Sequence, residues 1–388
     1  MRAVYILPIS WGGIPHYTAE LANAVAKYVD EVIVLKPRDN NTKLFSEDVD
    51  VREVFRPVTF SKKNMIKAFS PSNISNFLSF KNIKLVYDLR PDIIHFPELY
   101  PHISILTSVC KISDRYPIVY TRHTPFESLL DCIKSGRKIH NLFYGMLMCI
   151  SDITKYLVKV KAIIVHAPED KNKLIKRGFS PNKIFVIPHG AYNFLIRFKK
   201  LQDKETINYN NYKILFFGYI LRRKGLEYLI KAEPYISKEI PNIKIIIAGE
   251  GNVTPYLKYI QDSSKFEIYN EYISDQMVAE LFVRSDVVVV PYTFHLGHSG
   301  VLTIALSFGK PVIVTNVGDF PNIIRDGREG FVVPPKDPEA LAEAIIKILQ
   351  DDKLRKRMSK NALKRAKELS WDNIAKMHVE VYEKVTNK

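Results

Sequence analysis

Cysteine is scarce in this chain. Its 388 residues include three cysteines, Cys110, Cys132 and Cys149, all in the first half. Their odd number and the lack of CxxC spacing argue against a disulfide framework and against a zinc site. We therefore expect reduced thiols in a cytoplasmic protein.

Long apolar runs are also missing. The longest uninterrupted one covers residues 142–150, whereas a membrane-spanning helix needs roughly 20 apolar residues. The apolar run at residues 3–7 is too short for a signal peptide and ends before a turn, as a first strand does. We therefore expect neither an export signal nor a spanning segment.

Acidic residues are outnumbered. Lys and Arg number 57 against 41 Asp and Glu, a formal net charge of +16. Such a balance favours partners that carry phosphate, or an anionic membrane surface. The cations are spread over both halves, with no helix-turn-helix and no interleaved aromatic patch. We therefore do not expect nucleic acid as the partner.

Two cofactor signatures are absent or misplaced. No GxGxxG fingerprint occurs, which disfavours a nicotinamide cofactor. The one Asp-x-Asp triplet, at residues 48–50, precedes the strand-like run VREVF instead of following a buried strand. We therefore expect no cofactor and no metal.

The residues that are present alternate between strand and helix patterns. Short runs rich in β-branched residues predict strands at 3–7, 32–35, 93–96, 118–120, 162–165, 184–187, 214–217, 243–248, 287–290 and 312–315. Amphipathic segments separate them, and helical patterns follow at 338–350, 352–369 and 371–385. The pattern predicts an α/β protein with two Rossmann-like, doubly wound parallel sheets.

The polar, Asn-rich stretch after residue 195 predicts a domain boundary. We expect an N-terminal domain at residues 1–195, a linker at 196–212 and a C-terminal domain at 213–370. The last helix, 371–388, is expected to pack back on the N-terminal domain.

Four segments lie where ligands bind in parallel sheets, just after a strand. Gly12 and Gly13 allow backbone N–H groups to approach an anion, although a tight turn alone would also need them. Arg222, Arg223 and Lys224, between Gly218 and Gly225, could stabilise a diphosphate leaving group without a metal; a solvated basic loop is the alternative.

The candidate residues in the remaining two segments are a serine and a histidine. Ser299 opens an apolar helix whose first N–H groups and dipole form a second anion site, or it acts as an N-cap alone. His123, directly after a first-half strand, could donate to a sugar hydroxyl or to developing charge, or serve only as a local hydrogen-bonding residue.

Over nearly its whole length the chain resembles the GT-B glycosyltransferases of family 4, a retaining family. The most specific parts are FFGYILRRKGLEYLIKA and SGVLTIALSFGKPVIVTNVGDFP, which occur in the family's usual order. GGIPHYTAELANAVA and SWDNIAKMHVEVYEKV are similar to the two ends of family members.

The resemblance implies a role for each candidate residue. Lys224, with Arg222 or Arg223, clamps the donor diphosphate beside Gly218, and Gly12 and Gly13 line the cleft. His123 contacts the donor sugar. The backbone amides of Ser299, Gly300, Val301 and Leu302 receive the phosphate oxygens. Tyr272 and Ile273 hold the base through backbone contacts, and His298 lies beside Ser299.

The chain departs from the family pattern at three positions. Leu296 and Ile304 stand where many members carry a pair of glutamates near the donor. Tyr219 replaces an arginine that many members have one residue after the strand glycine. The GHSG form, with His298 beside Ser299, resembles a branch of the family that uses another polar residue in place of the carboxylate. The resemblance implies that Arg222 and Arg223 compensate for the arginine.

The resemblance implies retention at the anomeric carbon, with a nucleotide-sugar as donor and a saccharide or lipid-linked hydroxyl as acceptor. We expect the acceptor site in the first half, where the apolar run 142–150 lies between basic segments. These suit an anionic membrane surface, such as the inner face of the membrane, or belong to a buried helix with solvated flanks. A sugar-nucleotide epimerase of the same fold, or a non-catalytic nucleotide- or sugar-binding protein, is the alternative function.

Overall fold

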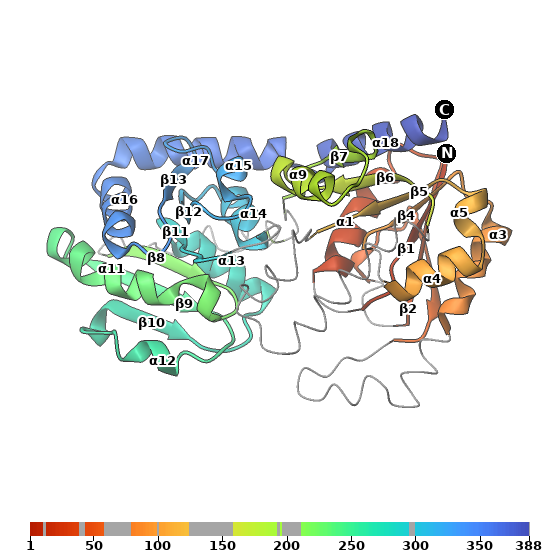
Figure 1. Cartoon of the computed structure of the whole chain (residues 1–388). Coiled ribbons are helices and arrows are strands. Elements are labelled where there is room, and N and C mark those ends of the chain that lie inside the picture. The colour runs from red at the N-terminus through yellow and green to blue at the C-terminus, as the bar shows by residue number, and fades with distance from the viewer. Residues whose placement is uncertain are drawn as a thin grey trace. The chain divides into compact units, whose positions relative to one another are not determined.

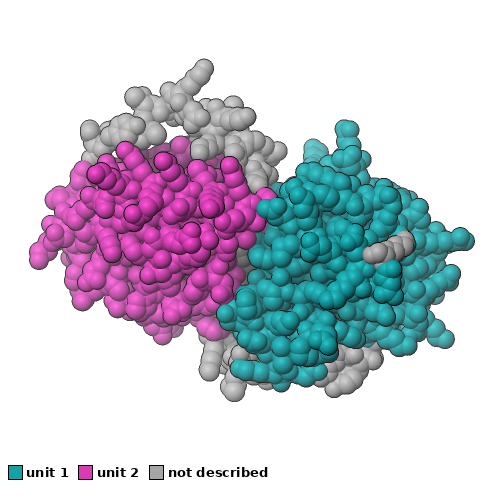
Figure 2. Space-filling view, turned by 90° about the horizontal axis from the view of Figure 1, so that it is seen from above, with its two compact units in different colours: residues 1–189, 371–388 teal, residues 190–370 magenta. Residues whose placement is uncertain are grey.

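The computed structural model describes residues 1–10, 13–38, 43–57, 79–98, 101–123, 158–191, 195, 211–294 and 299–387. The chain divides into two compact units (Figures 1 and 2). Unit 1 contains Met1–His189 together with Trp371–Lys388, and unit 2 contains Gly190–Ser370. The linker expected at 196–212 lies outside the described residues except for its last two.

Unit 1 is built on a seven-stranded parallel sheet with the strand order β3-β2-β1-β4-β5-β6-β7. The strands are β1 Arg2–Ile6, β2 Glu31–Pro37, β3 Val49–Phe55, β4 Ile93–Phe96, β5 Ile118–Thr121, β6 Val160–Val165 and β7 Ile184–Val186. The helices are α1 Ile14–Val25, η3 Ser79–Leu85, α3 Val86–Leu89, α4 Pro101–Val109, α5 Ile112–Arg115, α9 Pro168–Lys176, η5 Pro181–Lys183 and α18 Trp371–Thr386.

Both faces of this sheet are covered because alternate residues of each strand point to opposite sides. Val4 and Ile6 of β1 join the core under α4 and α9, whereas Ala3 and Tyr5 join the core under α1 and α18. Strands β1, β4 and β5 are therefore mostly apolar, as buried parallel strands are, whereas the edge strand β3, VDVREVF, carries three charged residues.

Unit 2 repeats the plan with a six-stranded parallel sheet in the order β10-β9-β8-β11-β12-β13. Its strands are β8 Tyr212–Phe217, β9 Ile243–Ala248, β10 Phe266–Tyr269, β11 Val287–Val290, β12 Val312–Thr315 and β13 Gly330–Val333. Its helices are η6 Arg222–Lys224, α11 Leu226–Glu239, α12 Thr254–Leu257, η7 Ser263–Lys265, α13 Asp275–Arg284, α14 Gly300–Ser307, α15 Phe320–Ile323, α16 Pro338–Gln350 and α17 Asp352–Glu368.

Helices of unit 2 begin where the sequence supplies a cap. The side chains of Ser274, Asp337 and Asp351 accept hydrogen bonds from backbone N–H groups at the starts of α13, α16 and α17. These N–H groups have no partner within the helix, so the caps satisfy them. The apolar stripes of α11 and α16 cover one face of the sheet, and α13 and α14 cover the other. Each fully buried Leu or Ile in these layers contributes about 1.5–3 kcal/mol.

The expected fold class is confirmed: both sheets are parallel and doubly wound. In each sheet the strand order reverses once, between β1 and β4 in unit 1 and between β8 and β11 in unit 2. Ligands of such sheets bind at the carboxyl ends of the strands beside that reversal. None of the helices in the described ranges is long and apolar enough to cross a bilayer, and the apolar run 142–150 lies outside those ranges.

Candidate functional site

The carboxyl ends of β8 and β11 lie side by side at the reversal point of the unit 2 sheet. After β8 the chain turns at Gly218, forms η6 with the three cations, and enters α11 through Gly225. After β11 it passes through Pro291 and Tyr292. The cationic segment predicted at 218–225 is therefore placed directly beside the end of β11.

Gly225 is required by the closeness of these two segments. Its φ of 71° is in the left-handed region, and a Cβ built on it would lie 1.8 Å from the carbonyl oxygen of Pro291. The amide of Thr293 donates to the carbonyl oxygen of Arg223 at 2.8 Å. Glycine is thus the residue that lets the end of β11 approach the start of α11.

Lys224 is directed at Tyr292. Its Nζ lies 3.8 Å from the centre of the tyrosine ring and donates a hydrogen bond to the tyrosine hydroxyl. Burial, and secondly the charge of Arg223, lowers the pKa of Lys224 to about 7. The free protein therefore stabilises the protonated form of Lys224 only weakly. A nearby anion would stabilise that charged form.

Tyr292 connects Lys224 to the start of α14. Its hydroxyl lies 3.3 Å from Oγ of Ser299, and its carbonyl oxygen accepts a hydrogen bond from Thr315 at 2.6 Å. Burial raises the pKa of Tyr292 to about 12, so the hydroxyl keeps its proton and can donate to Ser299. The cationic segment and the helix start are thus joined through one buried side chain.

The start of α14 lies within reach of Gly218. Ser299 is the N-cap but its side chain makes no capping bond, and α14 begins at Gly300. A Cβ built on Gly218 would lie 3.6 Å from Cγ2 of Val301. The amide of Leu302 already donates to the carbonyl oxygen of Ser299 at 3.1 Å. Ser299, Gly300 and Val301 are therefore the amides that this arrangement offers to an anion.

The GxG segment Gly249-Glu250-Gly251 supports the Gly218 turn. A Cβ on Gly249 would lie 2.1 Å from the carbonyl oxygen of Gly218, and one on Gly251 would lie 2.5 Å from that of Ile220. The amide of Ile220 donates to the carbonyl oxygen of Glu250 at 2.9 Å. These two glycines, like Tyr292, were absent from the sequence-based site.

Other predicted residues lie further along the sheet or outside the described ranges. Tyr272 and Ile273 follow β10; Tyr272 is 78% exposed and Ile273 packs on the core under α13. Arg222 is exposed and Arg223 half-buried. Gly13 is the N-cap of α1, whereas Gly12 and His298 lie outside the described residues.

His123 lies in unit 1, directly after β5, in a group of aromatic and imidazole rings. Its ring centre lies 4.5 Å from that of Tyr17 on α1, edge to face. Its Nδ1 lies 2.9 Å from Nε2 of His166, which follows β6. His189 and Trp371 pack around the same tyrosine.

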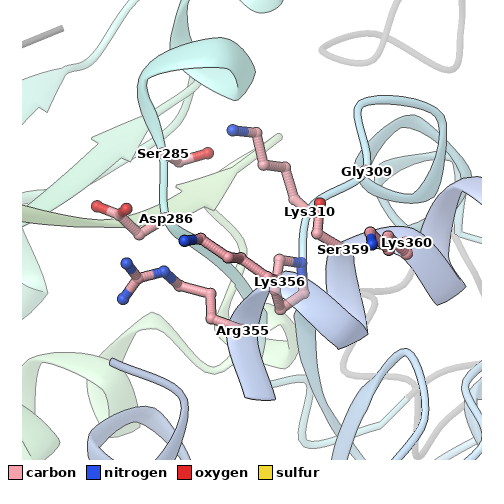
Figure 3. Close-up of a pocket in the computed structure, with 9 residues that line it drawn as sticks. Ser285, Asp286, Gly309, Lys310, Arg355, Lys356, Ser359 and Lys360 are labelled. Carbon is pink, nitrogen blue, oxygen red and sulfur yellow. The ribbon is translucent and has the colours of Figure 1, made fainter. Parts of the chain in front are cut away.

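A cationic pocket of about 370 Å³ lies at the opposite, amino-terminal edge of the unit 2 sheet (Figure 3). Lys310 precedes β12, and Arg355 and Lys356 extend from α17 toward Asp286 at the start of β11. Lys310 donates to the carbonyl oxygen of Val283, and Arg355 donates to that of Leu349 and pairs with Asp352. The contacts of these cations thus link neighbouring elements of unit 2, away from the Lys224 site.

Two family models match the chain in succession. The model described as "Glycosyltransferase Family 4" matches residues 11–191, and the model described as "Glycosyl transferases group 1" matches residues 197–365. The second range contains the Lys224 site, and the first contains His123.

Individual relatives agree with these models. The chain is similar to an uncharacterized glycosyltransferase of Methanocaldococcus jannaschii, 33% identical over 59% of this chain and 58% of that protein. It is also similar to the phosphatidyl-myo-inositol mannosyltransferase of Mycolicibacterium smegmatis, 25% identical over 100% of this chain and 94% of that one. The structure of HepE from Anabaena in complex with UDP matches with a TM-score of 0.70 and 18% identity, over 98% of this chain and 99% of that one.

Proposed function

The chain belongs to the glycosyltransferases of family 4 and group 1, with the GT-B fold, and from this premise we propose that it transfers a hexose from a nucleotide-sugar to a hydroxyl acceptor. The observation that carries the proposal is the Lys224–Tyr292–Ser299 connection at the reversal point of the unit 2 sheet. It places a cation and the amides of a helix start at one edge, as a diphosphate requires.

In the proposed reaction the bond between the anomeric carbon and the β-phosphate oxygen breaks, and the acceptor oxygen forms a bond to that carbon on the same face. The leaving diphosphate gains negative charge, which Lys224 and the amides of Ser299, Gly300 and Val301 stabilise. The acceptor proton passes to a leaving phosphate oxygen. Arg222 and Arg223 add positive charge beside Lys224, so the proposed step needs no metal.

The acceptor we propose is a saccharide or a lipid-linked hydroxyl. The M. smegmatis relative that spans the whole chain is named for transfer to phosphatidyl-myo-inositol, and the net charge of +16 suits a substrate at an anionic membrane surface. The basic segments around residues 142–150, on which the membrane attachment depends, lie outside the described residues.

A panel of UDP-, GDP- and ADP-sugars tests the donor part of this proposal. The matching donor, at about 100 times its dissociation constant, should stabilise the folded chain by about 2.7 kcal/mol, seen as a rise in melting temperature. Release of the nucleoside diphosphate should require an acceptor and persist in EDTA. Turnover of the sugar without acceptor would indicate an epimerase, and stabilisation without any turnover would indicate a binding protein.

Donor binding is also expected to take up a proton near neutral pH. The pKa of Lys224 is lowered to about 7 in the free protein, so a substantial fraction of this lysine is neutral at pH 7–8. A bound diphosphate favours the charged form, and binding should therefore draw in up to one proton at pH 8 and less at pH 6. Calorimetry in buffers of different ionisation enthalpy measures this uptake, which should disappear in Lys224→Met.

A further inference from the structure

Two histidines of unit 1 face each other at hydrogen-bonding distance. His123 follows β5 and His166 follows β6, and these neighbouring parallel strands hold the two backbones in register. Nδ1 of His123 lies 2.9 Å from Nε2 of His166, a distance at which one nitrogen donates a hydrogen to the other.

The other nitrogen of each ring is already committed as a donor. Nε2 of His123 lies 3.0 Å from the carbonyl oxygen of Pro97, and Nδ1 of His166 lies 3.0 Å from that of Ile187. A carbonyl oxygen only accepts, so both of these nitrogens carry hydrogen. A neutral imidazole has a single N–H. Two neutral rings would therefore point bare lone pairs at each other across 2.9 Å.

We propose that His123 and His166 share one additional proton, so that together they form a single cation in unit 1 at neutral pH. His166 is then a positioning residue, which holds the His123 ring and keeps it charged. The kinetic consequence rests on the proposed transferase function, since it assumes that His123 serves the transferred sugar. The protonation itself does not depend on that function.

An aromatic ring and buried residues of both charge signs surround the pair. Tyr17 of α1 places its ring 4.5 Å from that of His123 and 5.7 Å from that of His166, both edge to face. Glu98, which follows Pro97, is buried and offers a negative charge near the end of β4. Arg122, also buried, adjoins His123 in the chain.

Two other imidazoles of unit 1, those of His95 and His378, do not compete for the proton. Burial, then the charge of His378 and that of His123, holds the pKa of His95 well below its usual range. Burial lowers the pKa of His378 to about 4. His189, after β7, has its ring 5.3 Å from His166 and 5.5 Å from Trp371 of α18. Among these rings, His123 and His166 are the two that face each other while each donates its other N–H to a carbonyl oxygen.

Nitrogen-15 NMR of histidine-labelled protein at pH 7 tests the proposal directly. In the wild-type chain we expect one imidazolium in the pair, so that three of the four ring nitrogens carry hydrogen and only one of the two facing nitrogens is an unprotonated acceptor. In His166→Gln the glutamine amide can still donate to Nδ1 of His123, and His123 should become a neutral ring protonated at Nε2. His123→Gln should likewise leave His166 neutral and protonated at Nδ1.

The control is His378→Gln, which removes a buried histidine of the same unit outside the pair and should leave the imidazolium signal in place. Two neutral rings in the wild-type chain, with lone-pair signals from Nδ1 of His123 and Nε2 of His166, would overturn the shared proton. For the positioning role, His166→Gln should lower kcat about tenfold, the scale of one charge-assisted contact. An unchanged kcat in a variant that has lost the imidazolium would remove the pair from the reaction.

Discussion

Replacing Lys224 by methionine is expected to lower kcat for sugar transfer by about 10²-fold or more, the usual loss when one stabilising donor is removed from a developing oxyanion. Methionine keeps most of the volume and apolar contact of the lysine stem. What it removes is the Nζ that donates to Tyr292 and lies over its ring. Steady-state transfer with the donor identified by the sugar-nucleotide panel measures the effect.

The same variant should not unfold. Burial lowers the pKa of Lys224 to about 7, which means that the folded protein disfavours the charged lysine, so an apolar side chain at this position removes a desolvated charge. We expect a melting temperature equal to or above that of the wild-type chain. Loss of transfer together with loss of folding would contradict the specific role given to the ammonium group.

Lys231→Met is the matched control. Lys231 lies on α11, pairs with Glu227 and packs its ammonium group 4.5 Å from the centre of the Tyr259 ring. It therefore resembles Lys224 in its contacts, yet it belongs to the solvated face of the helix. Its removal should cost at most about 1 kcal/mol of stability, as expected for an exposed ion pair, and should leave transfer unchanged.

Sequence patterns predicted this site because its elements are local in the chain. A strand, a glycine, three cations and a second glycine occur within residues 212–225, and Ser299 precedes an apolar run with helical length. The parallel fold then determines that such segments meet at one edge. In the structure a Cβ built on Gly218 would lie 3.6 Å from Cγ2 of Val301.

The parts that could not be predicted depend on contacts between distant segments. Gly249 appears as an ordinary loop glycine until the carbonyl of Gly218 is seen 2.1 Å from where its Cβ would lie. Tyr292 is not among the predicted site residues, because nothing local indicates that a lysine 68 residues earlier reaches it. Strands β10 and β13 are also absent from the prediction: β10, FEIY, contains a carboxylate and is only partly buried, and β13 begins with a glycine.

The histidine group of unit 1 shows the same limit. His123 was found because it follows a strand, but His166 and His189 follow later strands and are buried. Only the order β4-β5-β6-β7 in the sheet brings their carboxyl ends to one edge. A search of the sequence for polar residues directly after each predicted strand would have collected these histidines.

Gly225→Ala is expected to destabilise unit 2 by about 2–5 kcal/mol, from about 1–2 kcal/mol for a left-handed backbone and about 1–3 kcal/mol for overpacking. The new methyl group would have to lie 1.8 Å from the carbonyl oxygen of Pro291. Relief requires that η6 and the end of β11 move apart, which separates Lys224 from Tyr292. The melting temperature and the affinity for the nucleotide-sugar should therefore fall together.

Gly327→Ala separates backbone strain from this close approach. Gly327 has nearly the same φ, 73° against 71° for Gly225, but a Cβ there would meet nothing within 4 Å. Its replacement should cost only the left-handed backbone term, about 1–2 kcal/mol, and should leave donor affinity unchanged. The contrary result is that the two alanine variants melt at the same temperature and bind donor equally well. In that case the contact between the start of α11 and the end of β11 does not hold the site together, and the position of Lys224 must depend on other contacts.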